Sequence, residues 1–145
     1  MAFKKILAIL LGGLIMCTSL SVSAFAETTS SVVDSEVAPA YEIVSYAQSN
    51  LSISGTTAYC TSTVSGPDVV SITVEQTLQR QGFLWLWYKV DGANWTNTFY
   101  KDSCSVTNTK SGLSSGKYRL KTVFTLTNKS GKSETITVYS VEKSI

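Results

Sequence analysis

Short runs in which apolar and polar residues alternate with period two fill the chain from Tyr41 onward. This period puts every second side chain on the same face of a β-strand, and no window has a sustained helical period. Glycine and proline interrupt the runs at residues 65–68, and a glycine does so again within residues 128–132, where turns are expected. About seven short strands separated by turns are typical of a single antiparallel immunoglobulin-like β-sandwich, so we predict an all-β domain. The alternating runs cover residues 42–48, 51–53, 56–64, 69–79, 84–90, 96–106, 118–127 and 134–141.

Leu113, Gly116 and Tyr118 form an L-x-x-G-x-Y pattern before the second-last long run. The pattern resembles the tyrosine corner of immunoglobulin-like and fibronectin-like sandwiches, in which a tyrosine donates its hydroxyl to the backbone a few residues upstream. An ordinary glycine turn followed by a strand tyrosine is the alternative. The corner interpretation gives these three residues a structural role.

The first 26 residues have the pattern of a secretory signal peptide. Lys4 and Lys5 precede an uncharged, mostly apolar run over residues 6–16, and Ala24-Phe25-Ala26 forms an A-x-A cleavage site. We expect cleavage after Ala26 and a secreted, extracellular protein. Residues 27–40 are small, polar and acidic, and are expected to form a disordered tail before a domain that covers residues 41–145. The mature part has no apolar run long enough for a membrane span.

Export also exposes the thiols to an oxidising compartment. Cys17 leaves with the leader, so Cys60 and Cys104 remain as a pair. A disulfide between them would close a loop of about 44 residues, which the chain-entropy model values at roughly 4 kcal/mol. The alternatives are two free thiols or a metal pair. We predict a structural disulfide, because two cysteines without histidine make a poor zinc site.

The chain contains no histidine, which excludes Ser-His-Asp and Cys-His catalysis and removes the commonest metal ligand. It has 12 Lys and Arg against 10 Asp and Glu, and two of the lysines lie in the leader, so the mature chain is close to neutral. A neutral domain lacks the basic footprint of a nucleic-acid-binding protein. We therefore predict a non-enzyme with no cofactor, metal or nucleic-acid partner. Catalysis by carboxylates alone is the remaining enzymatic alternative.

The most apolar run, residues 82–90, is the best candidate for a binding surface. In a flat strand, Phe83, Trp85 and Trp87 lie on one face, and only one face of a sandwich strand is buried. If the aliphatic face is buried, these three aromatic side chains form an exposed row that Trp95 and Tyr100 could extend. In the alternative, a tryptophan fills the core and a bulge reverses the alternation.

Several segments resemble a group of short secreted proteins from Gram-positive Firmicutes that share a domain of unknown function. These segments are LSISGTTAYC, LQRQG, the tryptophan-rich run, SGLSSGKYRLK and SGKSETITVYS. The most specific parts are G-x-Y-R-L-K at residues 116–121 and G-K-S-E-T at residues 131–135. The resemblance covers residues 41 to 141 and implies an exported β-sandwich, and it supplies no catalytic residues.

The expected function is that of a secreted, non-catalytic binding module with a cell-envelope glycan or protein as its partner. The aromatic run is the predicted contact, and Lys117, Arg119 and Lys121 are a second candidate because they alternate on one strand face. One alternative is a carbohydrate-binding module that uses exposed tryptophans. Another is a bacteriocin-like or toxin-like protein that acts on membranes, although a neutral charge does not favour its cationic form.

Overall fold

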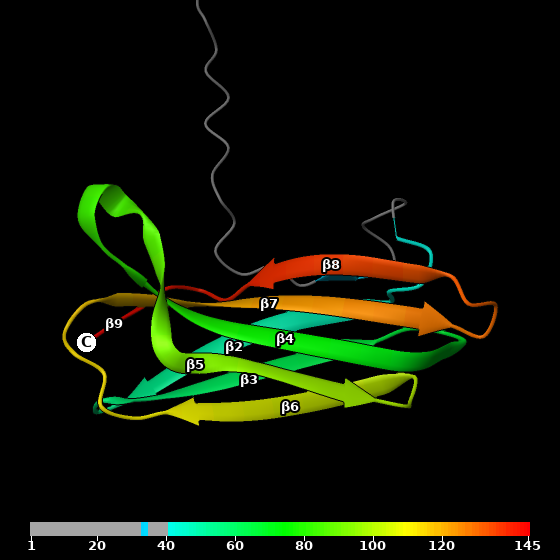
Figure 1. The fold of residues 1–145 in the computed structure, drawn as a ribbon, viewed down its shortest axis with the longest axis horizontal. Coiled ribbons are helices and arrows are strands. Elements are labelled where there is room, and N and C mark those ends of the chain that lie inside the picture. The colour runs from blue at the N-terminus through cyan, green and yellow to red at the C-terminus, as the bar shows by residue number, and fades with distance from the viewer. Residues whose placement is uncertain (1–32, 35–40) are drawn as a thin grey trace, which may run out of the picture.

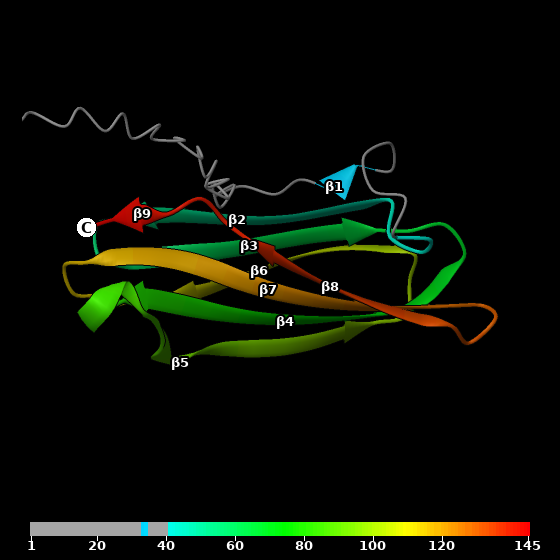
Figure 2. The same ribbon diagram turned by 90° about the horizontal axis from the view of Figure 1, so that it is seen from above.

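The computed structural model describes residues 33–34 and 41–145, and within them the chain is an antiparallel β-sandwich, as predicted. One sheet has the order β1-β2-β3-β6, and the other has the order β5-β4-β7-β8, with β9 paired to β7 (Figure 1). Viewed from above, β2 and β3 form one layer, and β4 and β5 lie in the other (Figure 2). The strands are β1 (Val33–Asp34), β2 (Tyr46–Ser54), β3 (Thr57–Ser65), β4 (Val69–Gln81), β5 (Trp87–Phe99), β6 (Ser103–Lys110), β7 (Lys117–Asn128), β8 (Ser133–Tyr139) and β9 (Lys143–Ser144).

Seven of these strands are long, and their order across the two sheets is immunoglobulin-like. The tyrosine corner is confirmed. Tyr118 is buried at the start of β7, and its hydroxyl donates to the carbonyl of Ser114 at 2.6 Å. A Cβ atom at Gly116 would lie 2.6 Å from Nε of Arg80, so a larger residue there would displace the Arg80 side chain. The corner fixes the entry of the chain into β7 next to the end of β4.

Buried and outward-facing side chains alternate along β7, as expected. Leu120, Phe124 and Leu126 are fully buried, and the basic residues between Lys117 and Lys121 face outward. The core consists of two apolar clusters, one around Phe124 and one around Leu120. Burial of these side chains is the main source of stability, at about 1.5–3 kcal/mol for each large one.

A buried hydrogen-bond network of polar side chains lies among the core residues of the two sheets. Gln76 donates through Nε2 to the carbonyl of Cys60 at 2.9 Å and to Oγ of Ser62 at 2.6 Å. The hydroxyl of Ser62 bonds that of Thr122 at 2.8 Å, and Asn108 donates to Oε1 of Gln76 at 2.7 Å. No buried side-chain nitrogen or oxygen in the described part of the chain lacks a partner. The network therefore joins the two sheets through specific hydrogen bonds of buried polar side chains.

Several strand boundaries differ from those expected. The runs expected at residues 42–48 and 51–53 form the single strand β2, and the run expected at 84–90 does not end before Asp91 and Gly92. They lie inside β5, where the register against β4 shifts between Thr77 and Gln79 and Gly92 has a positive φ of 66°. The run expected at 96–106 is split into β5 and β6 by a turn at residues 100–102. Gly92 therefore belongs to a bulge within β5.

The predicted disulfide is wrong. Cys60 and Cys104 lie on neighbouring strands of one sheet, but Cys104 pairs with Val64 and Cys60 pairs with Asn108. Four residues of register separate the two cysteines, about 13 Å along the strand, whereas a disulfide needs Cα atoms about 5.5 Å apart. Both are free thiols, and burial raises the pKa of Cys60 to about 12 and also raises the pKa of Cys104.

The start of the domain is held by Glu134, which lies in β8. Its carboxylate accepts the backbone N–H groups of Glu42, Ile43 and Val44 at 3.0 to 3.1 Å. Two residues of the expected disordered tail, Val33–Asp34, instead form β1, which pairs with β2. The predicted leader, its cleavage site and the rest of the tail lie outside the described residues.

Candidate functional site at the hairpin tip

The β4–β5 hairpin ends in a projecting loop, residues 82–86, which we call the hairpin tip. It stands clear of the two sheets at one end of the molecule (Figure 1). Inside it, Phe83–Trp85 form a single 3-10 turn, in which the N–H of Leu86 donates to the carbonyl of Phe83 at 3.3 Å. The N–H of Gly82 donates to the carbonyl of Leu86 at 2.8 Å and joins the two ends of the loop. A side chain does not fit at Gly82, because a Cβ atom there would lie 2.7 Å from the ring of Tyr88. The predicted strand over residues 84–90 is therefore a tight loop followed by the start of β5.

The side chains of the tip face water. Phe83 and Trp85 are each 79% exposed, and Leu84 and Leu86 are 66% and 54% exposed. In a flat strand, one of these two alternating sets would have been buried. The 3-10 turn instead projects both sets outward, so the expected flat row of Phe83, Trp85 and Trp87 does not form. Exposed apolar clusters of this kind are typical of interaction sites.

The backbone of the tip is strained at two positions. Leu84 and Trp85 have positive φ angles of 55° and 63°. For a residue with a Cβ atom, this left-handed region costs about 1–2 kcal/mol, and glycine or asparagine are the usual occupants. Two large apolar side chains in consecutive left-handed positions, without a core to pack against, do not serve the stability of the fold.

Trp87 has a different role from its neighbours in the tip. It is half-buried on the outer face of the second sheet, where the guanidinium of Arg119 lies 4.3 Å from the centre of its ring. The same guanidinium lies 4.3 Å from the ring of Tyr139, and Nε of Arg119 donates to Gln79 at 2.8 Å. This stack of ring, cation and ring supports the root of the tip, at about 0.5–1 kcal/mol for each cation–π contact.

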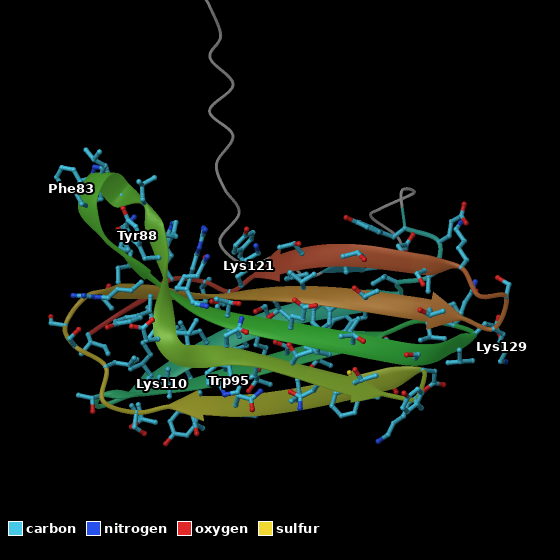
Figure 3. All side chains as sticks on the ribbon, in the orientation of Figure 1. Phe83, Tyr88, Trp95, Lys110, Lys121 and Lys129 are labelled. Carbon is cyan, nitrogen blue, oxygen red and sulfur yellow. The ribbon has the colours of Figure 1, made fainter. Side chains whose placement is uncertain are left out.

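The other two aromatic candidates do not extend the tip. Trp95 is half-buried and packs against the core cluster around Leu120, and it lies on the body of the sandwich in Figure 3. Tyr100 is 83% exposed, but it follows Phe99 at the far end of β5, roughly 40 Å along the strand from the tip. Of the predicted contact residues, the structure brings Phe83 and Trp85 together at the tip, with Trp87 at its root.

A pocket of about 380 Å³ lies at the base of the tip. Its lining includes Gly82 and Tyr88 from the hairpin, and three basic residues, Arg80, Lys89 and Lys110, but no carboxylate. Arg80 is held in place because its Nη2 donates to the carbonyl of Ser115 at 2.7 Å. The sequence analysis missed Arg80 and Lys110. The alternation of β4 could have indicated Arg80, which continues the inward-facing series of Gln76 and Leu78.

Charge is distributed unevenly between the two ends of the sandwich. The end with the hairpin tip carries seven basic side chains and two acidic side chains, Asp91 and Glu142, of which Glu142 pairs with Lys117 at 3.1 Å. At the opposite end, Lys129 pairs with Asp68, and Lys132 pairs with Glu42 (Lys129 in Figure 3). The latter contact lowers the pKa of Glu42 and raises that of Lys132. The basic side chains at the tip end are Arg80, Lys89, Lys110, Lys117, Arg119, Lys121 and Lys143.

The described residues contain no group of three or more carboxylate or cysteine side chains placed to hold a metal ion. Within the same residues, no helix has the length and apolar character needed to cross a bilayer. The carboxylate of Glu134 is engaged by three backbone N–H groups. Comparison with known proteins returns no match to the chain among protein-family models, curated proteins or solved structures.

Proposed function

We propose that this protein is a secreted, non-catalytic binding module that holds its partner through the hairpin tip. The observation that carries the proposal is the exposure of four consecutive large apolar side chains, from Phe83 to Leu86, on a strained loop. Water-exposed apolar surface of this kind is costly, and it is expected where a partner covers it. The rest of the fold supports the tip by the Arg119 stack and the Gly82–Tyr88 contact.

Export and a non-catalytic role are supported by the sequence. The leader pattern at residues 1–26 predicts secretion, and the lack of histidine leaves few groups for acid–base chemistry. The resemblance to small secreted proteins of Gram-positive bacteria agrees with a partner in the bacterial envelope. A glycan partner would stack on Trp85, but the row of alternate aromatic side chains that a flat strand would present to a sugar does not form, because Phe83–Trp85 are a 3-10 turn.

Cosedimentation of the secreted chain with whole Gram-positive envelopes, wall and membrane together, tests the proposal. The double variant Leu84→Asn with Trp85→Asn removes two apolar side chains and places asparagine, which tolerates positive φ, at both positions. Tyr100→Asn is the matched control, because it removes an equally exposed aromatic side chain at the other end of the sandwich. We expect the double variant to lose binding and the control to keep it. Equal binding by the double variant and the wild type would refute the tip as the contact.

A further inference from the structure

We propose that the hairpin tip attaches the protein to an anionic lipid bilayer, with the apolar side chains in the membrane interface and the surrounding cations on the lipid headgroups. This inference rests on the proposed function, and it names the partner of the same site. The shape of the tip, the charge around its base and the position of the pocket support it.

The shape of the tip favours a fluid surface over a structured partner. Phe83, Leu84 and Trp85 are consecutive residues of one 3-10 turn and all three are exposed, so apolar side chains leave the loop in several directions. A sugar ring needs a flat aromatic face, and a protein partner needs a pocket shaped to receive the whole tip. Lipid chains and headgroups rearrange around a projecting loop on all sides. Trp, Phe and Leu are also the residues that proteins place at the interface between water and lipid.

The charge around the tip matches an anionic surface. Of the seven basic side chains at this end, Lys117 is the single one with an ion pair in the part of the chain that the structure describes. Arg80 and Lys89 flank the loop directly on β4 and β5, and Figure 3 shows Lys121 near its root. Each such cation contributes attraction near an anionic membrane. The acidic side chains at the opposite end of the sandwich do not cancel this attraction, because they lie more than a Debye length from the membrane surface.

The pocket lies at the depth where lipid phosphates would be. Arg80 precedes Phe83 by three residues, so it lies about 10 Å from the end of the tip along the strand. An interfacial apolar segment is buried about 5–10 Å, which leaves Arg80 and Lys110 at headgroup level. A pocket with cations and no carboxylate, and with the guanidinium held by Ser115, suits a phosphate group.

Vesicle binding tests this inference on the full secreted chain. We would use vesicles of phosphatidylcholine alone and vesicles in which a quarter of the lipid is phosphatidylglycerol, and measure flotation and tryptophan fluorescence. Binding to the anionic vesicles, with a blue shift from Trp85 and a loss at high salt, is the expected result. The Leu84→Asn, Trp85→Asn variant should bind at least about tenfold more weakly.

The pocket cations have their own variants and controls. Arg80→Gln and Lys110→Gln should each weaken binding to anionic vesicles about fivefold, and Lys101→Gln, at the opposite end, should not. Soluble glycerol phosphate distinguishes a lipid headgroup from a free phosphate ligand. If the partner is lipid, glycerol phosphate at millimolar concentration should leave vesicle binding unchanged.

Failure of this inference and failure of the proposed function give different results. If the protein cosediments with envelopes in a tip-dependent manner but binds neither vesicle, the lipid partner is refuted, and a wall glycan or envelope protein takes its place. If it binds neither envelopes nor vesicles, both proposals are refuted. Equal binding to the neutral and the anionic vesicles would also overturn the inference, since the cations would then have no role.

Discussion

Replacing Gln76 with glutamate tests the buried network at the centre of the fold. Gln76 is 1% exposed, and its Nε2 donates to two acceptors, the carbonyl of Cys60 and the hydroxyl of Ser62. Glutamate has the same shape but replaces that NH₂ group with an oxygen. In the Gln76→Glu variant an ionised carboxylate would therefore face the Cys60 carbonyl without a proton between the two oxygens. The folded variant must bind a proton to avoid this repulsion.

The cost follows from the burial of the site. Buried glutamates reach pKa values of about 8 or 9, against about 4.3 in the unfolded chain. At pH 7 a carboxyl held protonated in this way destabilises the fold by about 4 kcal/mol, and the lost hydrogen bond adds about 1 kcal/mol at any pH. This loss is a large part of the roughly 5–15 kcal/mol that stabilises such a domain. Since the pKa is raised in the folded state, the loss is smallest below about pH 4 and grows by about 1.4 kcal/mol per pH unit above it.

Urea unfolding of Gln76→Glu, followed by tryptophan fluorescence at several pH values between about 4 and 7, measures this dependence. Gln79→Glu is the matched control, because Gln79 lies on the outer face of the same strand and its Oε1 accepts from Arg119. A carboxylate at that position gains a charged partner, so no loss at pH 7 is expected. If Gln76→Glu is as stable as the wild type at pH 7 and its stability does not depend on pH, the network is not sealed from water and our description of it is wrong.

Three further predictions concern stability and the support of the tip. A reductant should leave the unfolding midpoint unchanged, because Cys60 is not linked to Cys104. Cys60 should also resist thiol reagents in the folded protein, because burial raises its pKa to about 12. A lower unfolding midpoint in reductant would show that the two cysteines are linked after all. Glu134→Gln should cost about 1–3 kcal/mol in urea unfolding, because the neutral amide cannot accept three backbone N–H groups as a carboxylate does, and an unchanged midpoint would contradict that role. Arg119→Ala should red-shift the emission of Trp87 and cost about 1 kcal/mol, since the variant exposes the ring to water; identical spectra would show that the stack does not shield it.

Much of the fold followed from local patterns. The alternation of β7 correctly assigned its inward and outward faces, and the L-x-x-G-x-Y pattern correctly located the corner at Tyr118. These features depend on residues near one another in the chain and on the fixed period of a strand. For the same reason, the sequence identified the aromatic run at residues 82–90 as the surface to examine.

The conformation of the tip did not follow from the sequence. Residues 83–86 contain no glycine, asparagine or proline, so nothing in them marks a reversal, and a strand was the natural expectation. The reversal is imposed by the pairing of Gln81 with Trp87, which belongs to the long β4–β5 ladder. The same ladder absorbs Asp91 and Gly92 as a bulge, although these two residues alone resemble a hairpin turn.

The amino-acid sequence by itself determined that this chain forms a β-sandwich and which faces of its strands are buried, because period two and turn chemistry act over a few residues. Only the tertiary structure decided strand register. Register separates Cys60 from Cys104, gathers Arg80 and Lys110 around one pocket, and turns an apolar run into a projecting loop. Register depends on how side chains of neighbouring strands pack and on the geometry of the turns, and strands such as β3 and β6 pair without a turn that joins them.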